Sequence, residues 1–389
     1  MFRLKITEIA FHRYAWEVRD LGVDYNGFNQ VYEPGARRTM TGNIVTIQTD
    51  AGIRGEFAGG DDASMTQIAG FARYLLGRDP LQRELIHADI KRANRKNDRF
   101  GMGPVDCALW DIAGKTYGAS VVQLLGGWKT RLPGYASTYH GDHQPDGLNS
   151  PEAFASFGIQ CRDMGYPGMK IHPWGNPDIR REVQTVLAAR RAAGDEFDLM
   201  LDPACEYSTF IDTLRVGRAC DEARFLWYED PMKDGGISIQ AYRKLRELIR
   251  TPILIGEHTR GLETHTDLLV HGATDLLHTD PLYDMGITGC MKIAHAAEGF
   301  GLDVQSHAPG PAQRALMASI RNTSYYEMGL VHPRLGQAIR APIYADDYRD
   351  GLDAVDHNGT VPVPTGPGLG VTYDWEWIAR HRVDGATYQ

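Results

Sequence analysis

The chain has 389 residues, of which 42% are hydrophobic and 23% charged, as in an ordinary soluble globular protein with two domains or one elaborated barrel. Its net charge of −9 argues against nucleic acid or an anionic membrane as the main partner, because no basic surplus can neutralise phosphates. The five cysteines are scattered without CxxC spacing, and no apolar run reaches membrane-spanning length. We therefore expect a soluble cytoplasmic protein with reduced thiols.

The first 60 residues are predicted to form strands. Residues 6–16 make a first apolar run, and residues 43–49 and 53–57 make a hairpin. Between them, the polar and aromatic stretch 22–41 is predicted to be a loop. Such a loop is either a lid over an active site or an ordinary exposed connection.

Helical patterns follow these strands. Residues 63–95 show apolar periodicity, and residues 103–115 form a second helix with small residues that allow close packing. Residues 121–127 end in a Gly-Gly helix stop. Strands followed by helices without alternation predict a small α+β domain over residues 1–125.

From residue 126 to residue 330, short strand-like runs alternate with helical segments at intervals of 20–30 residues. This alternation is typical of parallel βα units, and eight of them predict a (β/α)8 barrel of the TIM type. Beyond residue 330 the pattern breaks, and residues 331–389 are predicted to be a C-terminal segment that returns to the first domain. The eight predicted strands are 131–139, 168–172, 197–201, 225–228, 253–256, 275–279, 302–306 and 324–326.

Carboxylates close three successive predicted strands. Asp202, Glu229 and Glu257 follow one another at intervals of 27 and 28 residues. Because parallel neighbours end on the same side, these carboxylates should meet at one rim, where a hard divalent cation would relieve their repulsion. Three oxygen donors favour Mg²⁺, or Mn²⁺, over Zn²⁺, although Cys205 and His258 lie close enough in sequence to leave zinc open.

Two candidate bases flank this predicted metal site. Asp280 and His307 close adjacent strands, so the carboxylate could fix the imidazole tautomer and raise its basicity, or the histidine could be a satisfied core residue. Lys170 and His172 alternate in one strand and share a face, and the pKa of Lys170 should fall toward neutrality beside a cation.

Glu327 closes the last predicted strand. It could donate a hydrogen bond to an oxyanion if protonated, or it could be a plain ion-pair partner. A cation with bases on two sides suits removal of a weakly acidic proton from the carbon next to a carboxylate.

The strand-end residues described above lie in segments that resemble the enolase superfamily, and within it the mandelate racemase subgroup, over nearly the full chain. The resemblance implies a capping α+β domain, a modified barrel, Mg²⁺ on Asp202, Glu229 and Glu257, an Asp280–His307 dyad, and Glu327 as an electrophilic partner of a substrate carboxylate. It also implies a homo-oligomer, from dimer to octamer. The segments that carry it are Gly165–His172, Leu201–Pro203, Trp227–Pro231, Ile255–Glu257, Asp280 with Met285–Gly289, Gln305–His307, and the helix from Asp106 to Lys115 with its end at Leu124–Gly127.

The chain departs from the family pattern at two positions. The usual Lys-x-Lys of the second barrel strand is Lys170-x-His172, so the residue in the usual base position is a histidine with a different pKa and reach. The asparagine often found two residues after the first metal ligand is Ala204. Both changes weaken the transfer of a substrate from other members of the family.

The function that we predict is dehydration of a sugar acid, an aldonate or aldarate, through an enediolate to a 2-keto-3-deoxy acid. One base, either His172 or Lys170, or else His307, would take the α-proton, and His307 would assist departure of the β-hydroxyl. A racemase or epimerase, a lactone cycloisomerase, and a sugar-acid binder without turnover are the alternatives. Placement alone suggests the substrate contacts Tyr25, Asn26, Arg37, Arg38, His140, His143, Trp174 and His258.

Overall fold

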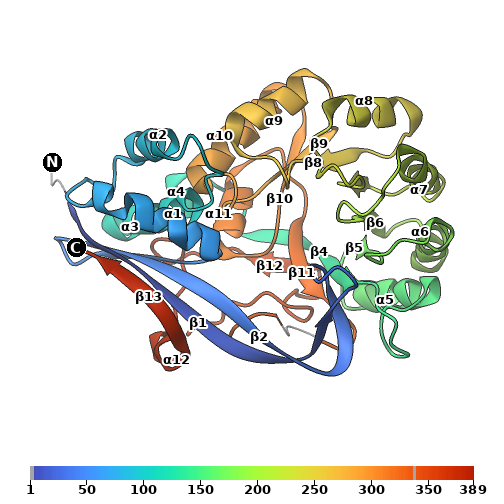
Figure 1. Ribbon diagram of the computed structural model, residues 1–389, viewed down its shortest axis with the longest axis horizontal. Helices are drawn as coiled ribbons and strands as arrows, with labels where there is room; N and C mark the ends of the chain where they lie inside the picture. Colours follow the sequence, from blue (N-terminus) through green and yellow to red (C-terminus); the bar gives the residue numbers. More distant parts are fainter. Residues whose placement is uncertain (1–3, 336–338) are drawn as a thin grey trace.

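A barrel of eight parallel strands forms the centre of the molecule (Figure 1), in a computed structural model that describes residues 4–335 and 339–389. The strands follow the order β10-β9-β8-β7-β6-β5-β4-β11 around the barrel, which confirms the predicted modified (β/α)8 architecture. Their bounds are β4 Arg131–His140, β5 Gly168–His172, β6 Asp198–Leu201, β7 Trp227–Glu229, β8 Ile253–Ile255, β9 Leu276–Thr279, β10 Asp303–Ser306 and β11 Tyr326–Val331.

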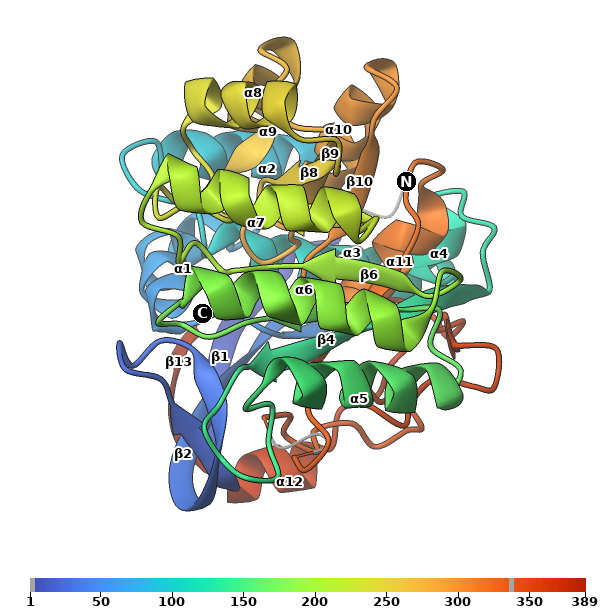
Figure 2. The ribbon, with the colours of Figure 1, turned by 90° about the vertical axis from the view of Figure 1, so that its right-hand side faces the viewer.

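One helix follows each barrel strand up to β10, and Figure 2 shows α5 to α8 lying one above another on the outer surface. These helices bury one apolar stripe each against the strands, as in α6, where Val186 and Ala189 face the barrel. After β11 the chain instead enters the C-terminal segment. The helices are α5 Pro151–Asp163, α6 Ile179–Ala193, α7 Phe210–Glu222, α8 Ile239–Leu248, α9 Gly261–Val270, α10 Gly286–Gly299 and α11 Pro311–Ser319.

Strands β10 and β11 stand at the two ends of the hydrogen-bonded strand order. Hydrogen bonds that involve side chains join them and close the barrel. Gln305 Nε2 donates to Ser324 Oγ at 2.9 Å, and the backbone N–H of Gly310 donates to the Tyr326 hydroxyl at 2.7 Å. The backbone N–H of Ala308 donates to Glu327 Oε2 at 2.7 Å. Glu327, a predicted site residue, therefore also helps to join β10 and β11.

A second unit covers one side of the barrel. Its sheet has the antiparallel order β13-β1-β2-β3, so the last strand of the chain pairs with the first. The β2–β3 hairpin occurs where the sequence predicts it. The unit contains β1 Ile6–Val23, β2 Gln30–Thr49, β3 Arg54–Ala58, α1 Asp62–Leu75, α2 Arg83–Ala93, α3 Met102–Tyr117, α4 Val121–Leu124 and β13 Arg382–Tyr388.

The C-terminal segment also touches the barrel before it reaches this sheet. It contains β12 Thr360–Pro362, which pairs with β4, and the short helix α12 Trp375–Arg380. The backbone N–H of Leu369 donates to Asp111 Oδ1 in α3 at 2.9 Å. The boundaries placed at residues 125 and 330 stay predictions.

The predicted loop over residues 22–41 is wrong. Strand β1 continues to Val23 and β2 begins at Gln30, so only residues 24–29 connect them in a long two-stranded ribbon. Val18 and Leu21 pack against Tyr139 of β4, while the other face of the ribbon is largely exposed. The apolar face of the ribbon can be recognised only when the barrel residues that it packs against are known. The exposed polar face made the composition of residues 22–41 resemble that of a loop.

Packed apolar side chains fill both units. Inside the barrel, Tyr135, Met200, Trp227 and Leu254 form one buried layer below the rim. In the capping unit, α1 and α3 pack on the sheet through residues such as Ile68 and Leu109. Among the described residues, no helix has the length and apolarity that crossing a membrane requires.

Candidate active site

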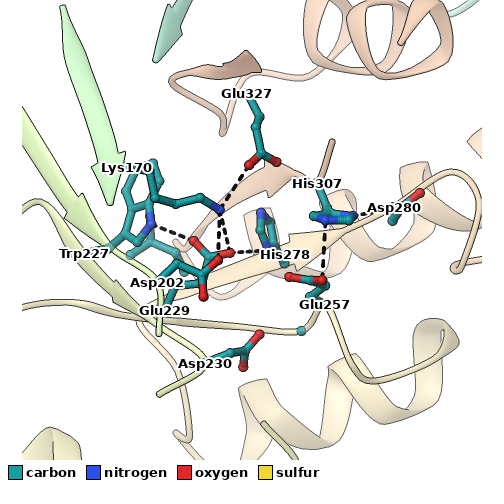
Figure 3. Close-up of polar contacts among 12 residues, drawn as sticks. Lys170, Asp202, Trp227, Glu229, Asp230, Glu257, His278, Asp280, His307 and Glu327 are labelled. Carbon is teal, nitrogen blue, oxygen red and sulfur yellow. Dashed lines mark hydrogen bonds and ion pairs between the residues drawn. The ribbon is translucent and has the colours of Figure 1, made fainter. Parts of the chain in front are cut away.

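The predicted carboxylates lie at the C-terminal rim of the barrel, where Asp202 and Glu229 contact the Lys170 ammonium group and Glu257 contacts His307 (Figure 3). Asp202 follows β6, Glu229 is the last residue of β7, and Glu257 lies just beyond β8. Lys170 Nζ, which β5 supplies from below, lies 3.2 Å from Asp202 Oδ2 and 3.0 Å from Glu229 Oε1. Neighbouring parallel strands thus bring together groups that are separated in sequence.

The buried charges perturb one another strongly. Burial and the nearby Asp202 carboxylate raise the pKa of Glu229 well above its usual range. Burial alone would lower the pKa of Lys170, but Glu229, Glu327 and Asp202 raise it well above its usual range. Carboxylates surround the ammonium group directly in this arrangement, and the fall in the pKa of Lys170 expected beside a bound cation stays a prediction.

His172 stands beside Lys170 on the same face of β5. Its Nδ1 lies 2.7 Å from the Thr138 carbonyl oxygen and its Nε2 lies 2.9 Å from Asp202 Oδ2. His140 packs behind it, with ring centroids 5.0 Å apart, and donates through Nδ1 toward the Pro173 carbonyl. Burial lowers the pKa of His140 to about 3, so it is a neutral packing partner for His172.

The predicted Asp280–His307 pair is assembled on the opposite flank. His307 follows β10, and its Nδ1 lies 2.6 Å from Asp280 Oδ2 at the end of β9. Its Nε2 lies 3.4 Å from Glu257 Oε1. Burial opposes the charged imidazolium, but Glu257 and Asp280 prevail and raise the pKa of His307 to about 10. The ring therefore holds a proton and is fixed in orientation.

Glu327 differs from its prediction in its place along the strand. It lies within β11 and does not close it, since the strand continues to Val331. Its Oε1 lies 3.1 Å from Lys170 Nζ, and its Oε2 accepts from the Ala308 N–H. Burial is outweighed by Lys170 and His307, so the pKa of Glu327 falls far below its usual range. The hydrogen bond from a protonated Glu327 to a substrate oxyanion stays a prediction.

Several features of this rim fit a divalent cation. Donor atoms of Glu229, Glu257 and His278 all lie within 4.8 Å of one another. Asp202 lies outside that set, with its Oδ2 against Lys170 and His172, but its carboxylate is close enough to repel Glu229 and Glu257. Buried His278 has no hydrogen bond to either ring nitrogen among the described residues, although its Nδ1 lies 3.2 Å from Glu229 Oε1. These carboxylates carry an excess of buried negative charge, and the His278 ring nitrogens have no hydrogen-bond partner among the described residues. Such a site suits Mg²⁺ or Mn²⁺.

His278 is the residue that sequence reasoning missed. It sits on β9, and its ring lies 5.6 Å from that of His307. Burial lowers its pKa to about 3, which keeps the imidazole neutral. Its position two residues before Asp280 in a strand was the available signal, because alternate strand residues share a face.

The backbone at the rim adopts unusual conformations that aim these side chains. Ala204 and Cys205 have positive φ angles of 49° and 63°, and the Ala204 N–H donates to Asp202 Oδ1 at 2.8 Å. Gly256 has φ 134°, and a Cβ there would meet the His278 carbonyl oxygen at 2.6 Å. Glycine is therefore required just before Glu257, where β8 approaches β9 closely.

The suggested substrate contacts divide into near and distant groups. His140 and His258 lie within the rim, whereas Arg37 is exposed on the ribbon and pairs with Glu17 at 3.6 Å, and Arg38 neighbours it in β2. Asn26 contacts the rim through Glu206, because its Nδ2 donates to Glu206 Oε1 at 3.0 Å. Sequence reasoning also missed Glu206, which lies four residues after Asp202.

A cavity of about 600 Å³ lies beside the ends of β4 and β5, under the turn of the ribbon. The suggested residues Tyr25, His143 and Trp174 line it, together with Arg181, whose guanidinium stacks 3.7 Å from the Trp174 ring. The cavity does not include the carboxylate cluster, so it adjoins the candidate site without being the site of the chemistry.

Comparison with known proteins agrees with this geometry. Residues 156–377 match the family described as enolase C-terminal domain-like, and residues 33–126 match the mandelate racemase/muconate lactonizing enzyme N-terminal domain. A D-glucarate dehydratase structure from Agrobacterium tumefaciens, described as complexed with magnesium, superposes with a TM-score of 0.87 at 27% identity. The superposition covers 98% of this chain and 99% of that one.

Two curated relatives bear different activities in their names. D-gluconate dehydratase of Thermoproteus tenax is 27% identical over 80% of this chain, although the match spans only 63% of that relative's length. D-galactarolactone cycloisomerase of Agrobacterium fabrum is 27% identical over 87% of this chain and 91% of its own length. The first family match alone covers more than half of the chain. The chain therefore belongs to the mandelate racemase/muconate lactonizing enzyme family, with an enolase C-terminal domain-like barrel.

Proposed function

We propose that the protein is a Mg²⁺-dependent sugar-acid dehydratase that converts an aldonate or aldarate to a 2-keto-3-deoxy acid. The single observation that carries the proposal is the asymmetry of the two flanks of the carboxylate cluster. The β5 flank presents a fixed ammonium group and an imidazole, Lys170 and His172, while the β10 flank presents a proton-holding imidazole, His307. Elimination across opposite faces of the substrate uses a base on one side and an acid on the other.

Asp202, Glu229 and Glu257, with His278 close by, are the residues that would hold the ion. Bound there, Mg²⁺ supplies positive charge that stabilises the negative charge that develops on the substrate carboxylate. The chain's own cation, Lys170, is placed to stabilise the same charge, because it already bridges Asp202, Glu229 and Glu327.

In the proposed reaction, His172 takes the proton from the carbon next to the carboxylate, and the bonding electrons form the enediolate. The enediolate then expels the β-hydroxyl, which leaves as water after His307 Nε2 gives it a proton. Asp280 holds the imidazole by its Nδ1, so that Nε2 faces the cluster. The enol that results tautomerises to the 2-keto acid.

His172 is a better candidate base than Lys170. A base must release its proton before it can accept one, and three carboxylates hold the proton on Lys170. His172 contacts one carboxylate, Asp202, which would turn toward a bound ion. The names of the D-gluconate and D-glucarate dehydratases support the substrate class at this level.

A cycloisomerase is the second candidate, because one relative that matches over most of its length bears that name. A lactone cycloisomerase would open or close a ring without releasing water or forming a keto group. A racemase would need each flank both to give and to accept a proton, and the proton held on His307 between Asp280 and Glu257 does not favour that exchange.

The test is a library of aldonic and aldaric acids, with their lactones, incubated with the protein and Mg²⁺. Formation of a 2-keto acid, detected as its semicarbazone, from one or a few acids supports the dehydratase. Turnover of lactones alone, without a keto product, would replace it with the cycloisomerase. The His307→Asn variant is the control for contaminating activity.

A further inference from the structure

A second group of possible metal donors lies next to the first and shares Glu257 with it. Donor atoms of Asp230, Glu257 and His258 lie within 4.8 Å of one another. Figure 3 shows Asp230 below Glu229 and Glu257, with no contact drawn to any of the labelled residues. None of the steps proposed above uses Asp230 or His258.

Asp230 is buried and unsatisfied. Its side chain is inaccessible to solvent, and neither carboxylate oxygen has a hydrogen-bond donor among the described residues. The closest charged partner is His258 Nε2, at 3.8 Å from Oδ2, which is beyond hydrogen-bonding distance. A buried carboxylate without donors is costly unless something positive neutralises it.

The backbone around Asp230 is fixed. Its N–H donates to the Leu254 carbonyl at 3.2 Å, its carbonyl accepts from Cys205 at 2.8 Å, and its φ of 29° is rare for a residue with a side chain. The following loop approaches the carboxylate through glycine, since a Cβ on Gly236 would lie 2.3 Å from Asp230 Oδ1. The carboxylate is thus held toward Glu257 and cannot turn away to solvent.

We propose that Asp230, Glu257 and His258 form a second divalent-cation site, which shares Glu257 with the first. Two carboxylates and one imidazole make a mixed oxygen and nitrogen set, which suits Mn²⁺ or Zn²⁺. His258 is exposed at the rim, so an ion can enter from solvent.

The sharing of Glu257 leaves one competing arrangement, in which a single ion occupies either donor set but never both. Binding stoichiometry separates the two arrangements. The experiment strips metal from the full-length protein and measures Mn²⁺ binding by equilibrium dialysis. The proposal predicts two Mn²⁺ ions per chain for the natural sequence and one for His258→Gln and for Asp230→Asn.

His271→Gln is the matched control, because His271 is an exposed histidine at the end of α9, and it should bind two ions. Circular dichroism and thermal melting establish that each variant is folded. Electron paramagnetic resonance gives an independent readout: two Mn²⁺ ions that share Glu257 should give a spin-coupled spectrum, and His258→Gln should give the signal of isolated Mn²⁺. One ion per chain in the natural protein, or an equal count in His258→Gln, would overturn the second site.

Discussion

The two flanks of the carboxylate cluster hold positive charge in different ways. On the β5 flank, Lys170 is 1% exposed and its ammonium group contacts carboxylates from β6, β7 and β11. On the β10 flank, the His307 side chain is 23% exposed and is held between Asp280 and Glu257. One flank therefore carries a permanent cation, while the other presents a proton at the mouth of the site.

This asymmetry favours an elimination. A reaction that only inverts a carbon centre needs each flank to give and accept a proton in turn, whereas an elimination across two faces needs a base on one flank and an acid on the other. The two flanks can be separated by removing the divalent ion, then each flank, then the residues that support them.

Removal of the divalent ion should have the largest effect, because both flanks act on charge that the ion stabilises. We expect a chelator to reduce sugar-acid turnover by about 10⁴-fold or more, since a bound ion supplies several kcal/mol of charge stabilisation. Turnover is measured before and after dialysis against EDTA, and added Mg²⁺ should restore it. An enzyme indifferent to the chelator would contradict the site.

The His307→Asn substitution should lower kcat by roughly 10³-fold, because it removes the general acid of the β10 flank. His271→Asn, at an exposed position, serves as the control and should leave kcat unchanged. If kcat fell equally in His307→Asn and His271→Asn, the loss would not be specific to the β10 flank.

The Lys170→Met substitution should reduce turnover and also destabilise the metal-free protein by about 3–5 kcal/mol, because it leaves buried carboxylates without their cation. Urea unfolding measures the loss. Saturating Mg²⁺ should recover much of it, since the ion replaces the missing charge. A variant whose stability does not respond to Mg²⁺ would argue that the ion binds elsewhere.

The raised pKa of His307 predicts a pH effect on the stability of the metal-free protein. Its pKa of about 10 lies above the ordinary value of 6.5, so its contribution is complete below about pH 6.5 and is lost as the pH rises toward 10. The difference in unfolding free energy between the natural protein and His307→Asn should shrink between pH 7 and pH 9.5. A difference that stays constant over this range would contradict the assignment.

The smallest expected effect concerns the ribbon turn. Glu206 accepts hydrogen bonds from Asn26 at 3.0 Å and from Asn29 at 3.1 Å, which fixes the turn over the rim. The Glu206→Gln substitution should weaken this hold and raise KM about 5-fold, or roughly 1 kcal/mol, with little change in kcat. A changed kcat with an unaltered KM would place Glu206 in the chemistry instead.

The barrel and its rim could be predicted because their signal is local and repeated. Asp202, Glu229 and Glu257 each follow an apolar strand at a regular interval, and parallel strands must bring such ends together. The same logic placed Asp280 beside His307. Glu327 lies inside β11 and not at its end, where it was predicted, but its carboxylate still contacts Lys170.

The failures lie where tertiary contacts decide. The ribbon of β1 and β2 has one apolar face, which packs on a cluster that includes Tyr139 of the barrel; without that partner its sequence was predicted to be a loop. The directions in which the pKa values of Lys170 and Glu327 shift depend on which charged groups surround them, which spacing does not give; the roles predicted for them beside a bound ion stay predictions. His278 escaped notice because it lies within a strand and not at its end.

The central claim, that the β5 flank removes the proton and the β10 flank releases the hydroxyl, is tested most directly by proton exchange in D₂O. With a substrate identified, NMR follows deuterium incorporation at the α-carbon in the His307→Asn and His172→Gln variants. We expect His307→Asn to exchange the α-proton without dehydration, and His172→Gln to do neither. Exchange that persists in His172→Gln and disappears in His307→Asn would contradict this division of roles.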